Sequence, residues 1–201
     1  RPLGTVIDPG DAVVLPPADD IQGGWNPELG VIIGRGGRDI PVGEAMRHVA
    51  GYTVVSDVTV DYFRRDYFAQ PEPRDWLEDA MSSWGDKKSD ARFPMGPYLV
   101  TPDEVGDPHA LDIKCWVNGE LRQNSNTKHL IFNCFDQIAH LSQAFTLDPG
   151  DVIFTGTSGG VGAAMKPMQF LKEGDVVRVE VEKLGYIENR VVPEKAETVI
   201  G

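Results

Sequence analysis

The sequence predicts a mixed, mainly β fold (α+β) with a few inserted helices. Residues 30–34 and 52–60 are rich in β-branched side chains, and residues 176–181 alternate apolar Val with Arg and Glu, as in a half-buried strand. Apolar residues at helical spacing occur in fewer places. Because many strands with few helices indicate a mixed architecture, and because 201 residues can bury one sizeable core, we expect a single domain.

The clearest local feature is a β-hairpin. Residues 115–117 and 120–122 are strand-like and flank the dipeptide Asn118-Gly119. Asn-Gly supplies the two positive-φ residues that a type I′ turn requires, and this turn matches the twist of the flanking strands. We therefore expect two antiparallel strands joined at these two residues.

Three helices are expected. The longest follows Asn126 or Thr127, either of which can cap it. A shorter helix should cover residues 42–49, and another should cover residues 74–84. In the longest helix the apolar side chains at helical spacing are Leu130, Ile131, Cys134, Phe135, Ile138, Leu141 and Phe145.

Charge and composition exclude several classes of partner. The net charge is −12, and the Lys and Arg residues are scattered, so we expect neither a nucleic-acid partner nor a membrane surface. No apolar run approaches the roughly 20 residues that a membrane-spanning helix needs. Cys115 and Cys134 are expected to be buried free thiols, which suits a reducing compartment. These features predict a cytoplasmic protein.

Several motifs follow one another between Lys87 and Thr157. In order after Lys87 they are Phe-Pro-Met-Gly-Pro at 93–97, Val-Asn-Gly-Glu at 117–120, Gln123, Asp-Pro-Gly-Asp at 148–151 and Thr-Gly-Thr at 155–157. This ordered set resembles the catalytic core of the fumarylacetoacetate hydrolase superfamily, over nearly the whole chain. The resemblance implies a β-roll-like fold, one catalytic domain over residues 1–201, a small oxo-acid substrate and a homodimer.

The resemblance also implies a metal site. In the family, both glutamates of an aromatic-Glu-x-Glu-Leu segment and the aspartate of a following strand bind the metal. The second glutamate falls on Glu28 and the aspartate on Asp57, whereas Asn26 replaces the first glutamate. An amide oxygen can bind Mg2+ or Mn2+ but removes one negative charge, so we expect weaker affinity, unless Asp19 or Asp20 contributes.

Other residues are implied to contact the substrate. Lys87 takes the place of the family lysine that points at the substrate oxygens, where an ammonium stabilises an enolate. Its neighbour Lys88 is expected on the surface. Thr157 and Gly156 would offer a hydroxyl and backbone donors to a carboxylate, and Gln123 aligns with a glutamine of several relatives. Without the resemblance, Thr157 is an ordinary turn residue and Gln123 an exposed hairpin end.

Some positions depart from the family pattern. Asp61 stands where relatives commonly have an arginine, and Arg64 or Arg65, one turn further on, could replace it in binding substrate. Ser158 stands where many relatives have proline. These differences affect the choice of substrate more than the fold.

Hydrolytic relatives also carry a His and Glu pair that activates water, on a segment upstream of the region that this chain represents. The histidines of the chain are expected to be structural or solvated; they are His48, His109, His129 and His140.

Three hypotheses follow. The first is a metal-dependent hydrolase that cleaves a carbon–carbon bond of an acylpyruvate-like or β-diketo acid, in aromatic or sugar-acid catabolism. The second is an isomerase or decarboxylase of a 2-oxo or 2-hydroxy-dienoic diacid on the same metal site, which needs no activated water. The third is a noncatalytic subunit that keeps the fold, if Asn26 abolishes metal binding.

Overall fold

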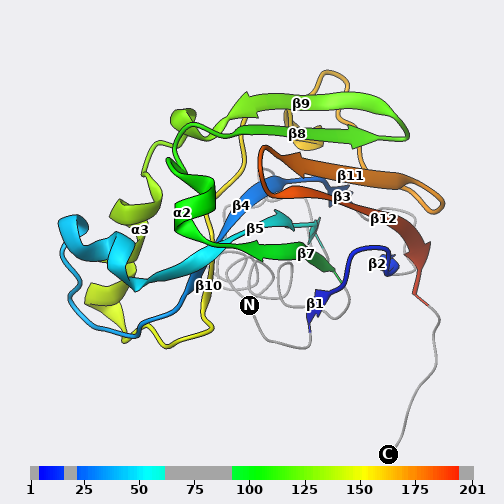
Figure 1. Ribbon diagram of the computed structural model, residues 1–201. Helices are drawn as coiled ribbons and strands as arrows, with labels where there is room; N and C mark the ends of the chain where they lie inside the picture. The colour runs from blue at the N-terminus through cyan, green and yellow to red at the C-terminus, as the bar shows by residue number, and fades with distance from the viewer. Residues whose placement is uncertain (1–4, 16–21, 62–91, 195–201) are drawn as a thin grey trace, which may run out of the picture.

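The computed structural model describes residues 5–15, 22–61 and 92–194 (Figure 1). Their strands form two five-stranded sheets and a two-stranded ribbon. The first sheet has the order β1 (Val6–Ile7), β7 (Phe93–Val100), β5 (Val49–Ser56), β4 (Pro27–Ile33) and β10 (Val152–Phe154). The second has the order β2 (Val13–Leu15), β12 (Gly185–Pro193), β11 (Val176–Val181), β8 (Asp112–Val117) and β9 (Glu120–Asn126). The ribbon pairs β3 (Gln22–Gly24) with β6 (Thr59–Asp61).

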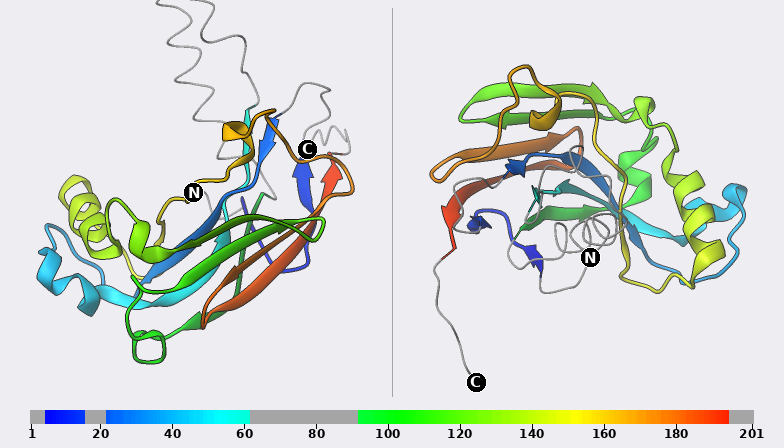
Figure 2. Two further views of the ribbon diagram at one scale, coloured as in Figure 1. Left: turned by 90° about the horizontal axis from the view of Figure 1, so that it is seen from above. Right: turned by 180° about the vertical axis from the view of Figure 1, so that it is seen from behind.

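The two five-stranded sheets form two layers around one core, which the turned views show (Figure 2). Leu29 and Val31 of β4 belong to this core, as do Val177 and Val179 of β11. Most neighbouring strands are antiparallel, but β1 pairs with β7 and β2 with β12 in parallel. The mixed, mainly β fold expected from the sequence is confirmed.

Strand β11 shows how the alternating pattern sets burial. Val177, Val179 and Val181 are buried, whereas Arg178 lies on the outer face with its guanidinium carbon 3.7 Å from the centre of the Tyr186 ring. The strand expected over these residues is confirmed.

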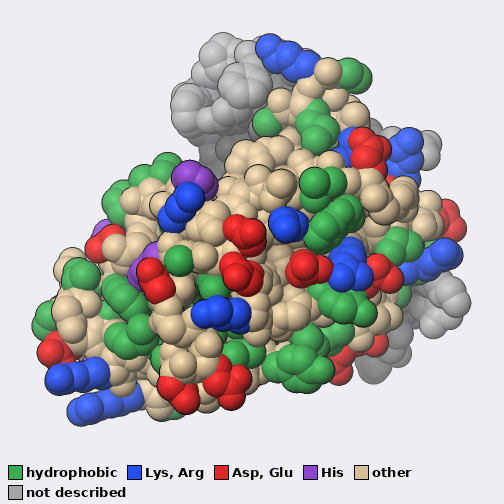
Figure 3. Space-filling model, turned by 45° about the horizontal axis from the view of Figure 1, so that its top comes forward, with side chains coloured by type: hydrophobic (Ala, Val, Ile, Leu, Met, Phe, Trp, Pro, Cys, Tyr) green, Lys and Arg blue, Asp and Glu red, His purple; other side chains and the backbone are tan. Residues whose placement is uncertain are grey.

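On the face shown in Figure 3, acidic and basic side chains lie interspersed.

The other strand predictions have different outcomes. The strand expected over residues 30–34 is present with shifted ends, as β4. The Asn118-Gly119 hairpin is confirmed, with φ values of 52° and 79° and Val117 opposite Glu120. The strand expected over residues 52–60 is two strands, because the chain stops pairing with β4 after Ser56 and starts pairing with β3 at Thr59.

The long helix begins later than expected. Asn126 caps only a short 3-10 helix, η3 (Thr127–His129), by accepting the N–H of Lys128. Helix α3 (Cys134–Ala144) then begins with its own capping box, in which Asn133 and Asp136 accept each other's backbone N–H groups. This second cap is the physical reason why the predicted start at Asn126 or Thr127 was wrong.

The other helical segments are short. The helix expected over residues 42–49 is a 3-10 helix, η2 (Val42–His48). The one expected over residues 74–84 lies outside the described residues. The structure adds α2 (Pro102–Val105) and a 3-10 turn, η4 (Gly162–Ala164). No helix within the described ranges is long and apolar enough to cross a membrane.

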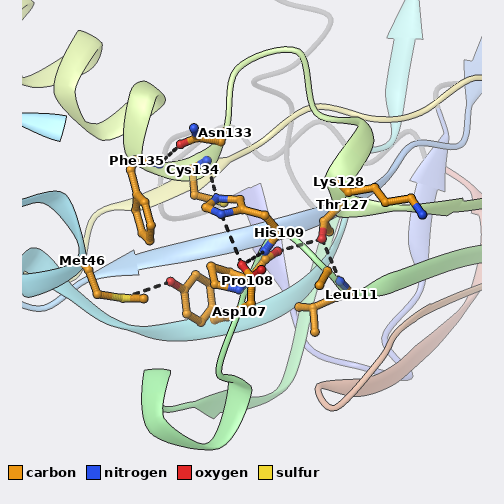
Figure 4. Close-up of polar contacts among 12 residues, drawn as sticks. Met46, Asp107, Pro108, His109, Leu111, Thr127, Lys128, Asn133, Cys134 and Phe135 are labelled. Atoms are coloured by element: carbon orange, nitrogen blue, oxygen red, sulfur yellow. Dashed lines mark hydrogen bonds and ion pairs between the residues drawn. The ribbon is translucent and has the colours of Figure 1, made fainter. Parts of the chain in front are cut away.

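A neighbouring loop holds the first turn of α3 (Figure 4). His109 Nε2 accepts the backbone N–H of Cys134 at 3.1 Å, and its ring stands edge-on to Phe135 with ring centres 4.9 Å apart. Asp107 Oδ1 accepts the backbone N–H of His109 at 2.9 Å. His109 therefore has the structural role expected of a lone histidine, because it satisfies a donor that the helix itself leaves without a partner.

The capping box gives a stability prediction. Replacing Asn133 by Ala removes the acceptor for the N–H groups of Phe135 and Asp136, so the free energy of unfolding should fall by about 1 kcal/mol. Urea unfolding measures this loss. Gln143→Ala, at an exposed position of the same helix, is the control and should change stability by less than about 0.5 kcal/mol. Equal losses in both variants would contradict the assigned cap.

The two cysteines are free and buried, as expected. Burial raises the pKa of the Cys115 thiol to about 12, although Arg122 acts in the opposite direction, and burial also raises the pKa of Cys134 to about 12. Both thiols thus keep their proton in the folded state up to a higher pH than in the unfolded chain.

The thiols should accordingly resist a thiolate-directed reagent at pH 8 in the native protein and react rapidly in urea. The same shifts should lower the free energy of unfolding as the pH rises above about 8.5, the ordinary thiol pKa, toward 12. Rapid labelling of either cysteine in folded protein would contradict this.

Candidate active site

Three candidate metal ligands share one face of the first sheet. Glu28 of β4 lies opposite Val55 of β5, and the backbone N–H of Asp57 donates to the carbonyl oxygen of Asn26 at 2.9 Å. This bond extends the ladder past the end of β5. Because side chains alternate along strands and opposite residues share a face, Asn26, Glu28 and Asp57 are brought together on the face that does not carry Leu29.

The two carboxylates are buried. Glu28 is 4% exposed and Asp57 is 2% exposed. Buried carboxylates need compensating hydrogen bonds or cations. Part of this compensation is visible, since the backbone N–H of Gly156 donates to Glu28 Oε2 at 2.8 Å.

The amide of Asn26 has a forced orientation. Its Nδ2 donates to the carbonyl oxygen of Asp57 at 2.8 Å and to Thr59 Oγ1 at 2.9 Å. A carbonyl oxygen can only accept, so the amide nitrogen must face it and Oδ1 is the atom left to meet a cation. Two carboxylates and one amide oxygen form a set of hard donors, which fits Mg2+ or Mn2+.

Within the described ranges, no three His, Cys, Asp or Glu side chains gather in one place. A cation on this face would therefore depend on the two carboxylates together with oxygens of other kinds. Asn26 offers such an oxygen in its Oδ1 atom, because its Nδ2 atom is used by Asp57 and Thr59.

A turn over residues 155–158 runs beside Glu28. It follows β10, which pairs with the other edge of β4, and both the backbone N–H and the hydroxyl of Thr155 donate to the carbonyl oxygen of Leu29. Gly156 has φ 93° and gives its N–H to Glu28. The Gly156 N–H expected for substrate is thus used by the protein, and the hydroxyl and backbone N–H of Thr157 remain as candidate substrate donors.

Gln123 reaches the same turn from β9. Its side chain is buried, and Nε2 donates to Thr157 Oγ1 at 3.1 Å, to the Ser158 carbonyl oxygen at 2.8 Å and to Ser158 Oγ at 3.2 Å. Gln123 is therefore no exposed hairpin end. The structure brings Gln123, Gly156 and Thr157 together with Glu28.

Other candidate residues lie outside the described residues. They are Lys87, Lys88, Arg64, Arg65, Asp19 and Asp20. Asp61 ends β6, and only its backbone is described. His129 and His140 do not belong to the carboxylate face; they line a groove that opens between α3 and the 155–158 turn.

Sequence reasoning missed two residues that hold the turn. The Trp25 indole donates to the carbonyl oxygen of Gly160 at 3.2 Å, and Gln137 Nε2 of α3 donates to the carbonyl oxygen of Thr155 at 3.1 Å. A tryptophan before a strand and a polar residue on a helix carry no pattern that predicts these long-range contacts.

A wide groove of about 1360 Å³ opens between α3 and the turn. Pro27 and Leu29 line it, so it lies across β4 from Glu28 and meets the carboxylate face only at the 155–158 turn. Ile131 on its rim is 92% exposed. The groove is thus mainly apolar and separate from the candidate ligands.

The family model described as fumarylacetoacetate (FAA) hydrolase C-terminal matches residues 1–192. The chain belongs to this family. It is 46% identical over 188 residues to the human mitochondrial oxaloacetate tautomerase FAHD2B, covering 94% of this chain and 56% of that protein. It is 42% identical over 186 residues to a 2,4-didehydro-3-deoxy-L-rhamnonate hydrolase of a Sphingomonas species, covering 92% of this chain and 61% of that protein. The chain thus spans little more than half the length of these relatives.

Solved structures of the family have the same fold. A fumarylacetoacetate hydrolase from Exiguobacterium antarcticum superposes with a TM-score of 0.80 at 34% identity, covering 95% of this chain and 64% of that one. Maleylpyruvate hydrolase from Sphingobium, in complex with manganese and pyruvate, superposes with a TM-score of 0.79 at 31% identity, covering 96% of this chain and 62% of that one. The homodimer, the cytoplasmic location and the one-domain extent stay predictions.

The carboxylate face predicts one Mn2+ site. Titration of Mn2+ into metal-free protein, followed by electron paramagnetic resonance of the free ion, should show binding that Glu28→Gln removes. Asn26→Glu should tighten it at least about tenfold, because a third carboxylate adds attraction for a dication.

Asn124→Glu is the matched control, since it places the same charge on an exposed position of β9. If the two substitutions to Glu raise the affinity equally, Asn26 does not face the ion. If the wild-type protein binds no Mn2+ at millimolar concentration, the assigned site is wrong.

Proposed function

We propose that this chain carries the catalytic site of a metal-dependent keto–enol tautomerase for a small 2-oxo acid. The observation that supports it is the shared face of Asn26, Glu28 and Asp57 beside the turn that presents Thr157. The 46% identity to a protein named oxaloacetate tautomerase favours this reaction among those of the family.

The ligands in this proposal are Glu28, Asp57 and the Oδ1 atom of Asn26. A bound Mg2+ or Mn2+ would polarise the 2-oxo group of the substrate. Gly156 holds the carboxylate of Glu28 in place through its N–H group, so the ligand is preorganised before any cation binds.

The proposed substrate contacts are made by Thr157 and Lys87. The Thr157 hydroxyl donates to the substrate carboxylate, and the Lys87 ammonium stabilises the negative charge that develops on O2 as the proton leaves C3. In the complete reaction a C3–H bond breaks and an O2–H bond forms. The reaction therefore consumes no water, and Arg64 and Gln123 remain candidate contributors to substrate binding.

The second candidate is hydrolysis of a carbon–carbon bond in an acylpyruvate-like acid. It is favoured by the 42% identity to a sugar-acid hydrolase and by the likeness to a maleylpyruvate hydrolase. Hydrolysis also leaves an enolate, which the same residues would stabilise, but it additionally needs an activated water. An isomerase or a decarboxylase would use the same enolate chemistry.

Lys87→Met tests this proposal on the complete protein. Loss of one preorganised group that stabilises developing charge should lower turnover about 100- to 1000-fold and leave Mn2+ affinity nearly unchanged. Lys88→Met is the control and should have little effect. If the two lysine variants behave alike, the assignment of Lys87 is wrong.

Two assays separate the candidate reactions. Loss of the enol absorbance of oxaloacetate measures tautomerisation, and coupled detection of pyruvate measures cleavage of an acylpyruvate. Tautomerisation without pyruvate release is the expected result. Pyruvate release from acylpyruvate at a higher kcat/KM would favour the hydrolase, and a protein that binds Mn2+ but turns over neither substrate would favour a noncatalytic subunit.

A further inference from the structure

A β-bulge turns Gln123 toward the candidate site. Counting back from the hairpin turn, a regular ladder would place Gln123 opposite Lys114, on the outer face of the sheet. The pairing shifts by one residue, so Gln123 lies opposite the buried Cys115 and Arg122 is the extra residue of the bulge. Because one residue of register exchanges the two faces of a strand, this bulge alone makes the side chain point inward.

The orientation of the Gln123 amide is fixed by its strongest partner. The carbonyl oxygen of Ser158 accepts at 2.8 Å and cannot donate, so Nε2 must face it. A flipped amide would set two carbonyl oxygens against each other. The second N–H of Nε2 then reaches both Thr157 Oγ1 at 3.1 Å and Ser158 Oγ at 3.2 Å, and since an amide nitrogen only donates, Thr157 is the acceptor in its bond with Gln123.

We infer that Gln123 is a positioning residue that commits the Thr157 hydroxyl to donating. One lone pair of Thr157 Oγ1 is taken by Gln123, so its proton is directed to another acceptor. An anionic oxygen is the partner that such a donor favours. This step rests on the proposed function: the anionic acceptor of the Thr157 hydroxyl is then the carboxylate of the 2-oxo acid.

The packing of the turn supports this role. Gly160 has φ 107°, and a Cβ atom there would lie 2.8 Å from both the carbonyl oxygen of Arg122 and the Cγ atom of Gln123. The segment that directly follows the turn therefore lies against the bulge, and the Trp25 indole also donates to the carbonyl oxygen of Gly160. Thr157 is thus held before any ligand arrives, which is the condition for preorganised binding.

The buried Oε1 atom of Gln123 also supports the positioning role. Its Oε1 atom is buried, and no described residue donates to it. An orphaned buried acceptor lowers stability, and an apolar side chain of similar size would avoid that loss. A buried glutamine at this position is therefore better explained by what its nitrogen does for the turn than by packing.

Pyruvate binding to the Mn2+-loaded complete protein tests the inference. Gln123→Met removes the donor and should weaken pyruvate binding about tenfold, whereas Gln123→Glu sets an acceptor against Thr157 and should weaken it about 100-fold at pH 8. Mn2+ affinity should stay within about twofold in both. Pyruvate binding to the Glu variant should recover as the pH falls, because the buried carboxyl then gains a proton and donates again.

Asn124→Asp is the matched control, with the same change from amide to acid on the exposed neighbour, and should bind pyruvate like wild type at every pH. Equal affinities for Gln123→Glu and Asn124→Asp would overturn the inference. A wild-type protein that binds no Mn2+ or no pyruvate would instead overturn the proposed function.

A second measurement needs neither ligand. Nuclear Overhauser effects between the Gln123 side-chain amide and the Thr157 methyl should appear in the metal-free protein. Their absence would overturn the positioning role whatever the protein binds.

Discussion

Strand β4 places apolar side chains on one face of the first sheet and polar side chains on the other, and the rest of the structure depends on this arrangement. Leu29, Val31 and Ile33 are buried in the core, whereas Asn26 and Glu28 alternate with them on the opposite face. A slip of one residue in pairing would bury the carboxylate in the core and expose the core side chains. Burial of the apolar side chains of β4 therefore fixes the position of its polar side chains.

The carboxylate face is closed by close backbone approach. At Gly30 a Cβ atom would lie 2.8 Å from methyl groups of both Thr53 and Val55, so only glycine lets these side chains fill that space. On the other edge of β4, Gly156 brings its N–H within 2.8 Å of Glu28. One glycine on β4 and one in the 155–158 turn thus set how tightly the surroundings of Glu28 are packed.

The 155–158 turn is held from several directions by groups that lie far apart in the sequence. The Thr155 hydroxyl donates to the carbonyl oxygen of Leu29, and Gln137 of α3 donates to the carbonyl oxygen of Thr155. Gln123 donates to Thr157 and Ser158. Since α3 is in turn fixed at its first turn by His109, a change well outside the site can move the turn. Such support is what a site built on rigid elements needs to keep a hydroxyl within hydrogen-bond reach of its ligand.

The sequence by itself determined the mainly β class, the Asn118-Gly119 hairpin and the burial pattern of β11, because these depend on local turn chemistry and on period-two alternation. The family resemblance that the ordered motifs carry also predicted that Glu28 and Asp57 lie together. The structure decided which of two possible caps begins α3: Asn126 caps only η3, and the capping box of Asn133 and Asp136 starts α3 at Cys134. It likewise decided that Gln123 points inward and that Gly156 serves Glu28, because a bulge and a contact across 128 residues leave no local pattern in the sequence.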